Sequence, residues 1–392
     1  MSEKQYVIVG GGIAGTTAAE ELRKIDAGAS ITLIDQEHQR LYSRVLLEHY
    51  VTGKIERDRL FLRKEEWYQG KGIDFQSGVV VEEIDTKNKF VKTSEGRELP
   101  YDKLLITAGG EVNLIEQDLK GVSYMRTLDD ADYLLQMAAA AQTKKDRAAI
   151  VRGGGFIAVE YTNFFVVRGF ATTILLRGDQ FMSRVLLKES SDLLLEACRA
   201  AGVTVLFNEK EAELVGDDQL EAIRLADGRE LPCDILGVGV GIHTEKVVLE
   251  KAGLSLGQGI FTNEFLETNV KDVYAAGDIA EYEDVILGRR LVMGNWVNAF
   301  GQARVVAKNM AGERTAYELV SSYSTNLLGL EVAFVGDVSK QYADEVVLYS
   351  QTAKGLVQLF EREGRTVGAI LLGDMKRRQE ITNAIKNKKR FE

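Results

Sequence analysis

Three glycines near the N-terminus, Gly10, Gly12 and Gly15, have the G-x-G-x-x-G spacing that suits the binding of a dinucleotide pyrophosphate. Gly10 allows a tight turn, Gly12 lets a phosphate approach a backbone that carries no Cβ, and Gly15 lets a helix pack closely on a strand. Asp35, further along the chain, can accept hydrogen bonds from ribose hydroxyls. These residue types at this spacing therefore predict the binding of a dinucleotide.

The segments around these residues predict the elements that must position them. Residues 6–9 form a short β-branched run typical of a buried strand, and residues 16–23 have helical composition. A second apolar run, 31–34, ends directly at Asp35. The helix would present unpaired N–H groups and its positive dipole to the phosphates, beside Ile13 and Ala14. A glycine turn with a purely structural role is the alternative.

The same pattern occurs a second time in the chain. A predicted strand over 148–151 leads to Gly153, Gly155 and Ala158, which again have the fingerprint spacing, and a strand over 172–176 follows. Two such units in one chain are harder to produce by accident than one. We therefore predict a second dinucleotide site, with a glycine-rich packing turn as the alternative.

The order of the remaining segments predicts the fold class and the domains. A hairpin signal at 89–101 and a buried run at 104–106 complete a first doubly wound sheet, and four apolar runs after residue 317 suggest an antiparallel domain with a basic helix over 376–389. The expected fold is α/β, with two Rossmann-like domains and a C-terminal α+β domain. The predicted division is 1–110 and 240–316 for the first dinucleotide domain, 111–239 for the second, and 317–392 for the third.

Composition excludes several functions. The net charge of −10 disfavours nucleic acid or an anionic membrane as partner, and no apolar run predicts a membrane span or a signal peptide. The two cysteines, Cys198 and Cys233, fit a cytoplasmic protein without disulfides, and both are expected to be structural. His38, His49 and His243 show no spacing that predicts a metal site.

Three further motifs carry a resemblance to a known family. They are Thr107-Ala108-Gly109, Tyr274-Ala275-Ala276-Gly277-Asp278, and Gly294-Asn295-Trp296-Val297-Asn298-Ala299 ahead of a predicted helix. With the two fingerprints, they make the whole chain resemble the flavoproteins with two dinucleotide-binding domains that are related to glutathione reductase. Within them it is similar to the NAD(P)H-dependent rubredoxin and ferredoxin reductases and to apoptosis-inducing factor.

The resemblance implies two cofactors and a set of residues for each. In that family the first domain, split by the second, binds FAD, and the second binds NAD(P)H. The FAD-binding residues implied here are Gly10, Gly12, Ile13, Ala14, Gly15, Asp35, Arg44, Val81, Thr107, Ala108, Gly109, Gly277, Asp278, Trp296 and Val297. Those implied for NAD(P)H are Gly153, Gly155, Ile157, Arg177 and Gly239.

Two residues of the second unit are implied to act at the reacting rings. Glu160 matches a glutamate beside the nicotinamide carboxamide, with an acid favoured by the helix dipole as the alternative. Phe156 matches an aromatic gate over the flavin, with ordinary helix–sheet packing as the alternative. Leu176 stands where NADH users place an acid, so Arg177 beside it, with Arg184 further on, predicts that both coenzymes bind.

The expected function is that of an FAD-dependent NAD(P)H oxidoreductase that passes electrons to a small redox protein of rubredoxin or ferredoxin type, or to an iron–sulfur partner subunit. No cysteine lies where disulfide-reducing relatives need one, because Tyr42 and Ser43 stand there. An oxygen-using NAD(P)H oxidase and a redox-switched, partner-binding flavoprotein are the rivals. Homo-oligomers are possible, and the basic run 386–390 is either a solvated tail or a docking patch for an acidic partner.

Overall fold

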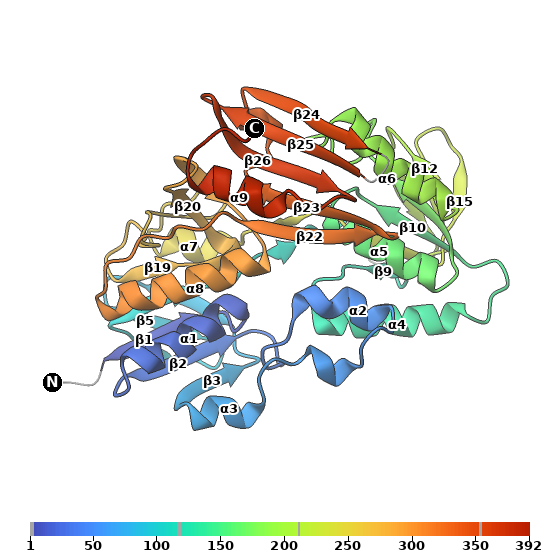
Figure 1. Cartoon of the computed structure of the whole chain (residues 1–392). Helices are drawn as coiled ribbons and strands as arrows, with labels where there is room; N and C mark the ends of the chain where they lie inside the picture. The colour runs from blue at the N-terminus through green and yellow to red at the C-terminus, as the bar shows by residue number, and fades with distance from the viewer. Residues whose placement is uncertain (1–3, 116–118, 211, 353–354) are drawn as a thin grey trace. The chain divides into compact units, whose positions relative to one another are not determined.

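The computed structural model describes residues 4–115, 119–210, 212–352 and 355–392 (Figure 1). The chain divides into two compact units, one made of residues 1–43, 58–111 and 242–321 and the other of residues 44–57, 112–241 and 322–392. The helices are α1 (Ile13–Ile25), α2 (Leu47–Val51), α3 (Glu65–Gly70), α4 (Leu128–Ala141), α5 (Phe156–Val167), α6 (Lys188–Ala200), α7 (Val247–Lys251), α8 (Trp296–Ala311) and α9 (Arg378–Lys386).

A five-stranded parallel sheet forms the centre of the first unit, in the order β19-β7-β1-β2-β3. Its strands are β1 (Gln5–Val9), β2 (Ser30–Asp35), β3 (Ile73–Ser77), β7 (Lys103–Ile106) and β19 (Val273–Ala275). The apolar runs predicted as strands are buried here because helices and loops cover a parallel sheet on both faces. Strand β19 follows residues 112–241 of the second unit in the sequence, so the first unit is interrupted by the second, as predicted.

Smaller elements complete the first unit. Helices α1 and α8 lie side by side (Figure 1). Two antiparallel or mixed three-stranded sheets contain β4 (Val81–Asp85), β5 (Phe90–Thr93) and β6 (Glu98–Pro100), and β18 (Ile260–Thr262), β20 (Ala280–Asp284) and β21 (Arg289–Val292). The short strands β8 (Glu111–Val112) and β17 (Ile242–His243) lie where the chain passes between the units.

The second unit contains another five-stranded parallel sheet, ordered β12-β11-β10-β16-β9. Its strands are β9 (Val122–Ser123), β10 (Ala148–Arg152), β11 (Ala171–Leu175), β12 (Thr204–Leu206) and β16 (Ile235–Val238). An antiparallel sheet of β13 (Ala212–Val215), β14 (Ala222–Leu225) and β15 (Glu230–Pro232) joins it. Helix α4 begins in a capping box, in which Thr127 and Asp130 each accept from the other's backbone N–H.

The C-terminal part is an antiparallel sheet in the order β22-β23-β26-β25-β24, with α9 packed on β23 and β26 (Figure 1). The strands are β22 (Ser322–Leu327), β23 (Leu330–Gly336), β24 (Glu345–Thr352), β25 (Gly355–Arg362) and β26 (Arg365–Leu372). Four of these were predicted. The fifth, β22, has the polar sequence SYSTNL, which offers no apolar alternation, and its pairing with β23 makes it a strand.

Basic residues lie in two short helical stretches of the chain. The stretch from Arg57 to Lys64 contains a 3-10 turn at residues 57–60, and α3 begins after it at Glu65. Glu65 and Glu66 suit the positive end of the helix dipole, so the regular helix starts after the basic residues. The C-terminal helix is shorter than predicted at both ends. Within the part of the chain that the structure describes, no helix has the length and apolar character needed to cross a bilayer.

Candidate dinucleotide-binding sites

The first glycine turn leaves one open position between two crowded ones. Gly10 has φ +106°, and a Cβ added there would lie 2.4 Å from the Thr107 carbonyl oxygen. A Cβ on Gly15 would lie 1.9 Å from the Gly10 oxygen. A Cβ on Gly12 would meet nothing within 4 Å. Protein packing therefore explains Gly10 and Gly15 but not Gly12, whose open face fits an approaching pyrophosphate.

Residues predicted from distant segments meet at this turn. The Thr107 hydroxyl donates to the oxygens of Val9 and Gly10, at 3.0 and 2.9 Å. The Asp35 carboxylate lies against Gly11, since a Cβ on Gly11 would be 2.5 Å from Asp35 Oδ2. The structure thus brings the predicted ribose acceptor to the same turn as the predicted phosphate cradle.

A second motif of the first unit reaches the same place. Gly277 has φ +83°, and a Cβ there would lie 3.2 Å from the Ala14 side chain and 3.8 Å from that of Ala299. Its N–H donates to Gln302 Oε1 at 2.7 Å. Gln302 is fully buried on α8, its Nε2 has no acceptor among the described residues, and no motif predicted it. Glutamine inside a helix carries no sequence signal for this role.

The other residues predicted for FAD belong to the first unit, with the exception of Arg44. Ala108 and Gly109 follow Thr107, with φ +72° at Gly109, and Val81 is the first residue of β4. Trp296 and Val297 begin α8 after the N-cap Asn295, and Val297 is exposed. A Cβ on Gly294 would lie 3.4 Å from the Asp278 carboxyl carbon, so these two motifs are adjacent. Arg44 belongs to the second unit, where its Nη1 donates to the Arg126 oxygen at 2.6 Å.

The second glycine turn repeats the geometry of the first. Gly153 has φ +131°, and a Cβ there would lie 2.3 Å from the Gly239 oxygen. A Cβ on Gly239 would itself be 2.9 Å from the Ala158 nitrogen, whereas one on Gly155 would meet nothing within 4 Å. Ile157 is the second residue of α5. Gly155 therefore presents the same open face as Gly12.

One side chain distinguishes the two turns. A Cβ on Gly154 would lie 2.7 Å from Leu176 Cδ2, so Leu176 occupies the place that Asp35 occupies beside Gly11. Leu176 is buried and offers no hydrogen-bond acceptor, while Arg177 and Arg184 are exposed. The place of the acid that reads a 2′-hydroxyl is therefore apolar here, with two guanidinium groups in the loop that follows.

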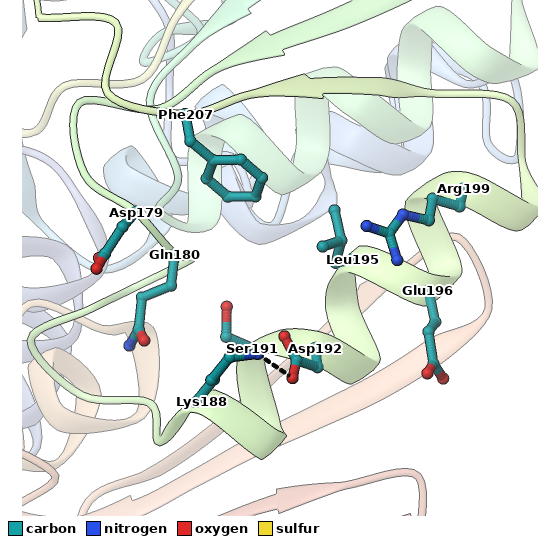
Figure 2. Close-up of a pocket in the computed structure, with 9 residues that line it drawn as sticks. All are labelled: Asp179, Gln180, Lys188, Ser191, Asp192, Leu195, Glu196, Arg199 and Phe207. Atoms are coloured by element: carbon teal, nitrogen blue, oxygen red, sulfur yellow. Dashed lines mark hydrogen bonds and ion pairs between the residues drawn. The ribbon is translucent and has the colours of Figure 1, made fainter.

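A hollow of about 460 Å³ opens next to that loop, and Figure 2 shows its lining. It lies between the loop and α6, and its lining comprises Asp179, Gln180, Lys188, Ser191, Asp192, Leu195, Glu196, Arg199 and Phe207. Lys188 is paired with Asp192 at 2.6 Å. The lining holds three carboxylates against two bases and includes neither Arg177 nor Arg184, so its charge does not favour a phosphate.

Glu160 lies on the first turns of α5 in a poorly hydrated position. Burial and, after it, the negative charge of Glu48 together raise the pKa of its carboxyl to about 8. Glu48 is buried and binds Lys54 Nζ at 3.1 Å. Glu160 is therefore mostly protonated at neutral pH, and a neutral carboxyl can donate a hydrogen bond as well as accept one.

This raised pKa predicts a pH-dependent stability. Between pH 4.5 and 8 the unfolded chain loses the Glu160 proton and the folded protein keeps it, so the free energy of unfolding falls as pH rises. Relative to Glu160→Gln, wild type should lose about 1–3 kcal/mol between pH 5 and pH 8.5, after discounting for solvent relaxation. Urea denaturation at both pH values measures this, with the exposed Glu196→Gln as control. Equal pH profiles for wild type and Glu160→Gln would contradict it.

Phe156, the first residue of α5, packs among other aromatic rings of its unit. Its ring meets Tyr323 and Phe334 edge-on, at centroid distances of 5.1 and 4.9 Å. Tyr323 and Phe334 stack on each other at 5.2 Å. These contacts favour the packing interpretation, because a gate would have to leave them, and the role of Phe156 at a flavin stays a prediction.

The cysteines and the basic C-terminal run have structural surroundings. Cys198 and Cys233 are buried and unpaired, and burial raises the pKa of both thiols, that of Cys198 to about 11. The basic residues of the run 386–390 are all exposed, while the end of the chain packs on the C-terminal sheet. Arg390 forms an ion pair with Glu361 at 2.9 Å, and the buried Phe391 donates its N–H to Thr366.

One group of side chains has the spacing of metal ligands. Ligand atoms of Glu111, His243 and Glu245 lie within 4.8 Å of one another, and this is the single such group among the described residues. All three are exposed, and Glu245 Oε1 already accepts from the Val247 N–H at 3.1 Å. Nothing else in the structure points to an ion there.

Comparison with known proteins now places the chain. The sequence model of the pyridine nucleotide-disulphide oxidoreductases matches residues 4–303, and that of the rubredoxin NAD+ reductase C-terminal domain matches residues 324–389. The chain belongs to the pyridine nucleotide-disulphide oxidoreductase family. This oxidoreductase therefore combines the family's two dinucleotide folds with a rubredoxin-reductase-type C-terminal domain, as its motifs predicted.

Individual relatives agree with this family. The chain is 30% identical over 381 residues to the nitrite reductase [NAD(P)H] of Bacillus subtilis, covering 95% of this chain and 46% of that protein. It is 31% identical over 368 residues to the 5,5′-dehydrodivanillate O-demethylase ferredoxin reductase subunit of a Sphingobium species, covering 92% and 88%. The chain spans about half the length of the first curated relatives it matches.

A solved structure confirms the architecture. The ferredoxin reductase of the CYP199A2 system from Rhodopseudomonas palustris superimposes with a TM-score of 0.91 and covers 99% of this chain and 96% of its own. Its sequence is 24% identical, so this likeness shows the fold alone. The α/β class with two Rossmann-like sheets and a C-terminal antiparallel sheet is therefore confirmed.

Proposed function

We propose that this oxidoreductase binds FAD in its first unit and NAD(P)H in its second, and passes electrons from the nicotinamide through the flavin to a small redox protein or an iron–sulfur partner subunit. The observation that carries the proposal is the pair of open glycines. Gly12 and Gly155 face empty space, although each turn crowds its other glycines against protein atoms. An unfilled position in a tightly packed turn is what a bound pyrophosphate requires.

The residues present fit both cofactors. Asp35 supplies a carboxylate for ribose hydroxyls in the first fold. In the second fold Leu176 stands in the place of that carboxylate, and the neighbouring Arg177 offers a cation. FAD, when bound, would accept a hydride and release its electrons to the acceptor. The protein's own contribution is to hold the pyrophosphates, orient the rings and keep Glu160 neutral beside the start of α5.

The identity of the acceptor rests on the relatives' names and on the cysteines. A ferredoxin reductase subunit is 31% identical to the chain, and it is similar in length. The nitrite reductase of about twice the length and the assimilatory nitrate reductase electron transfer subunit support the alternative of an acceptor in a partner subunit or a further domain. With both cysteines buried and protonated, a protein acceptor is favoured over a disulfide.

An anaerobic titration tests the proposal. Purified protein is titrated with NADH and then NADPH while the flavin absorbance is followed, and rubredoxin, ferredoxin or oxygen is added afterwards. Full bleaching by coenzyme and rapid recovery with an iron–sulfur protein are expected. Turnover with oxygen alone would instead support the oxidase, and slow bleaching with redox-dependent oligomerisation would support the redox-switched binder. A protein that carries no flavin would overturn the proposal.

The cysteines lead to a separate expectation about disulfides. Their thiols are buried and their pKa values are raised, so thiolate chemistry at neutral pH is suppressed. NAD(P)H-dependent reduction of oxidised glutathione or thioredoxin should therefore stay at background. Robust reduction that persists in Cys198→Ala and Cys233→Ala would contradict the direct electron route, and reduction lost in either variant would show that the thiol is reactive.

A further inference from the structure

Two residues of the C-terminal sheet region hold the loop between β11 and α6. Lys340 Nζ donates to the oxygens of Ser183, at 3.1 Å, and Leu186, and the Lys340 N–H donates to the Arg184 oxygen at 3.3 Å. Gln358 Nε2 donates to the Val185 oxygen at 2.7 Å. Four consecutive carbonyls of the loop, 183–186, are thus bound by Lys340 and Gln358, which follow them by more than 150 residues.

Gln358 also accepts hydrogen bonds from the end of this loop and from the first turn of α6. Its Oε1 accepts from the Leu187 N–H and from the Ser190 hydroxyl, both at 2.9 Å. Gln358 and Ser190 are fully buried. A buried glutamine that satisfies three partners in one segment specifies the conformation of that segment, because any other arrangement would leave polar groups unpaired.

The loop held in this way contains Arg184, one of the two arginines that follow the second glycine fingerprint. It begins a few residues after Leu176, the apolar replacement for a 2′-hydroxyl acceptor, and includes the exposed Arg184. Met182 immediately before it adopts φ +43°, which a residue with a side chain rarely adopts. The loop also has hydrogen bonds of its own, from the Val185 and Leu186 N–H groups to the Met182 oxygen and from Gln180 Nε2 to the Leu186 oxygen. The contacts from Lys340 and Gln358 add to these and attach this strained loop to the C-terminal sheet region.

We infer that Lys340 and Gln358 are positioning residues for coenzyme selection, which hold residues 183–187 so that Arg184, together with Arg177, faces the 2′-phosphate of NADPH. The inference rests on the proposed binding of NAD(P)H by the second unit. It gives the C-terminal domain a part in choosing the coenzyme, in addition to any part in binding a partner. The ligand recognised is an adenosine nucleotide with a phosphate on the 2′-oxygen, which two guanidinium groups can bind by charge-assisted hydrogen bonds.

The experiment compares nucleotide binding with loop opening. The variants are Gln358→Leu, which removes three hydrogen bonds, Lys340→Met, and the milder Ser190→Ala, which removes one. The controls are Gln351→Leu and Lys376→Met, at exposed positions of the same domain. Calorimetry of the full chain measures dissociation constants for 2′-phospho-ADP-ribose and for ADP-ribose. Hydrogen exchange followed by mass spectrometry reports opening of residues 183–190.

The expected result is a loss confined to the phosphate-bearing nucleotide. In Gln358→Leu and Lys340→Met its dissociation constant should rise about tenfold, the order of one charge-assisted contact, and in Ser190→Ala about threefold. ADP-ribose should change less than about twofold, and exchange at 183–190 should speed up, with both controls unchanged. If Gln358→Leu or Lys340→Met does not fold, Ser190→Ala still decides by the ratio of the two dissociation constants.

Two outcomes would overturn the inference, and a third would overturn the proposed function on which it rests. Equal weakening of both nucleotides would mean that Lys340 and Gln358 support the fold only. Faster exchange with unchanged binding of 2′-phospho-ADP-ribose would mean that the loop does not face the phosphate. If wild type binds neither nucleotide, the proposed function itself fails, and this is visible before any variant is made.

Discussion

Gly12→Val should purify as a colourless protein that still folds. A valine side chain would fill the open face of the first turn, where a Cβ on Gly12 meets no protein atom within 4 Å. The substitution therefore leaves the packing of the apoprotein nearly unchanged and excludes the pyrophosphate from the backbone N–H groups. We expect loss of nearly all bound flavin, measured as the ratio of absorbance at 450 nm to that at 280 nm.

The matched control is Gly28→Val. Gly28 is exposed in the turn before β2, and a Cβ there also meets nothing within 4 Å, so the change in size and backbone freedom is the same. Gly28→Val should remain yellow. Gly12→Val with full flavin occupancy and an unaltered circular dichroism spectrum would show that the first turn does not cradle the cofactor. A colourless control would show that the loss is not specific to the turn.

Arg177→Ala should weaken the use of NADPH about tenfold to a hundredfold while leaving NADH within a few-fold. Arg177 is exposed directly after Leu176, and its guanidinium can pair with a 2′-phosphate that NADH lacks. Loss of one charged contact costs about 1.5–3 kcal/mol, which corresponds to that range. Steady-state kcat/KM for both coenzymes, with the anaerobic rate of flavin reduction, measures the effect.

Two companion variants make this result specific. Arg199→Ala removes an exposed arginine from α6 and should affect neither coenzyme. Leu176→Asp restores in the second turn the carboxylate that Asp35 provides in the first, so it should shift preference toward NADH by repelling the 2′-phosphate. If wild type ignores NADPH, or if Arg177→Ala harms both coenzymes equally, Arg177 does not read the 2′ position.

The sequence by itself determined those features that depend only on residues a few positions apart in the chain. Each fingerprint combines a glycine at positive φ, a glycine without neighbours and a small residue at the helix start, and these requirements act over a few residues. For that reason the strands and helices around Gly10 and Gly153, the two sheets, and the family were all predictable. The apolar runs of a parallel sheet are readable in the same way, because burial on both faces leaves little choice of residue.

Tertiary structure alone decided the features that depend on distant partners. Glu48 and Glu160 come together through α2 and α5. Burial and the charge of Glu48 raise the pKa of Glu160, and the positions of the two residues in the sequence do not predict this. Ser322–Leu327 became a strand through its pairing with β23. Arg390 was read as part of a basic run, yet Glu361 neutralises it across 29 residues.

Gln302, Lys340 and Gln358 show the same limit most clearly. Each is an ordinary polar residue within a helix or strand region, and each acquires its role only by satisfying backbone groups of another segment. Buried hydrogen bonds are pairwise and long-range, so the identity of one partner says little until the fold has placed the other. The sequence predicted that dinucleotides bind, and the fold determined which polar residues hold the surrounding loops in place.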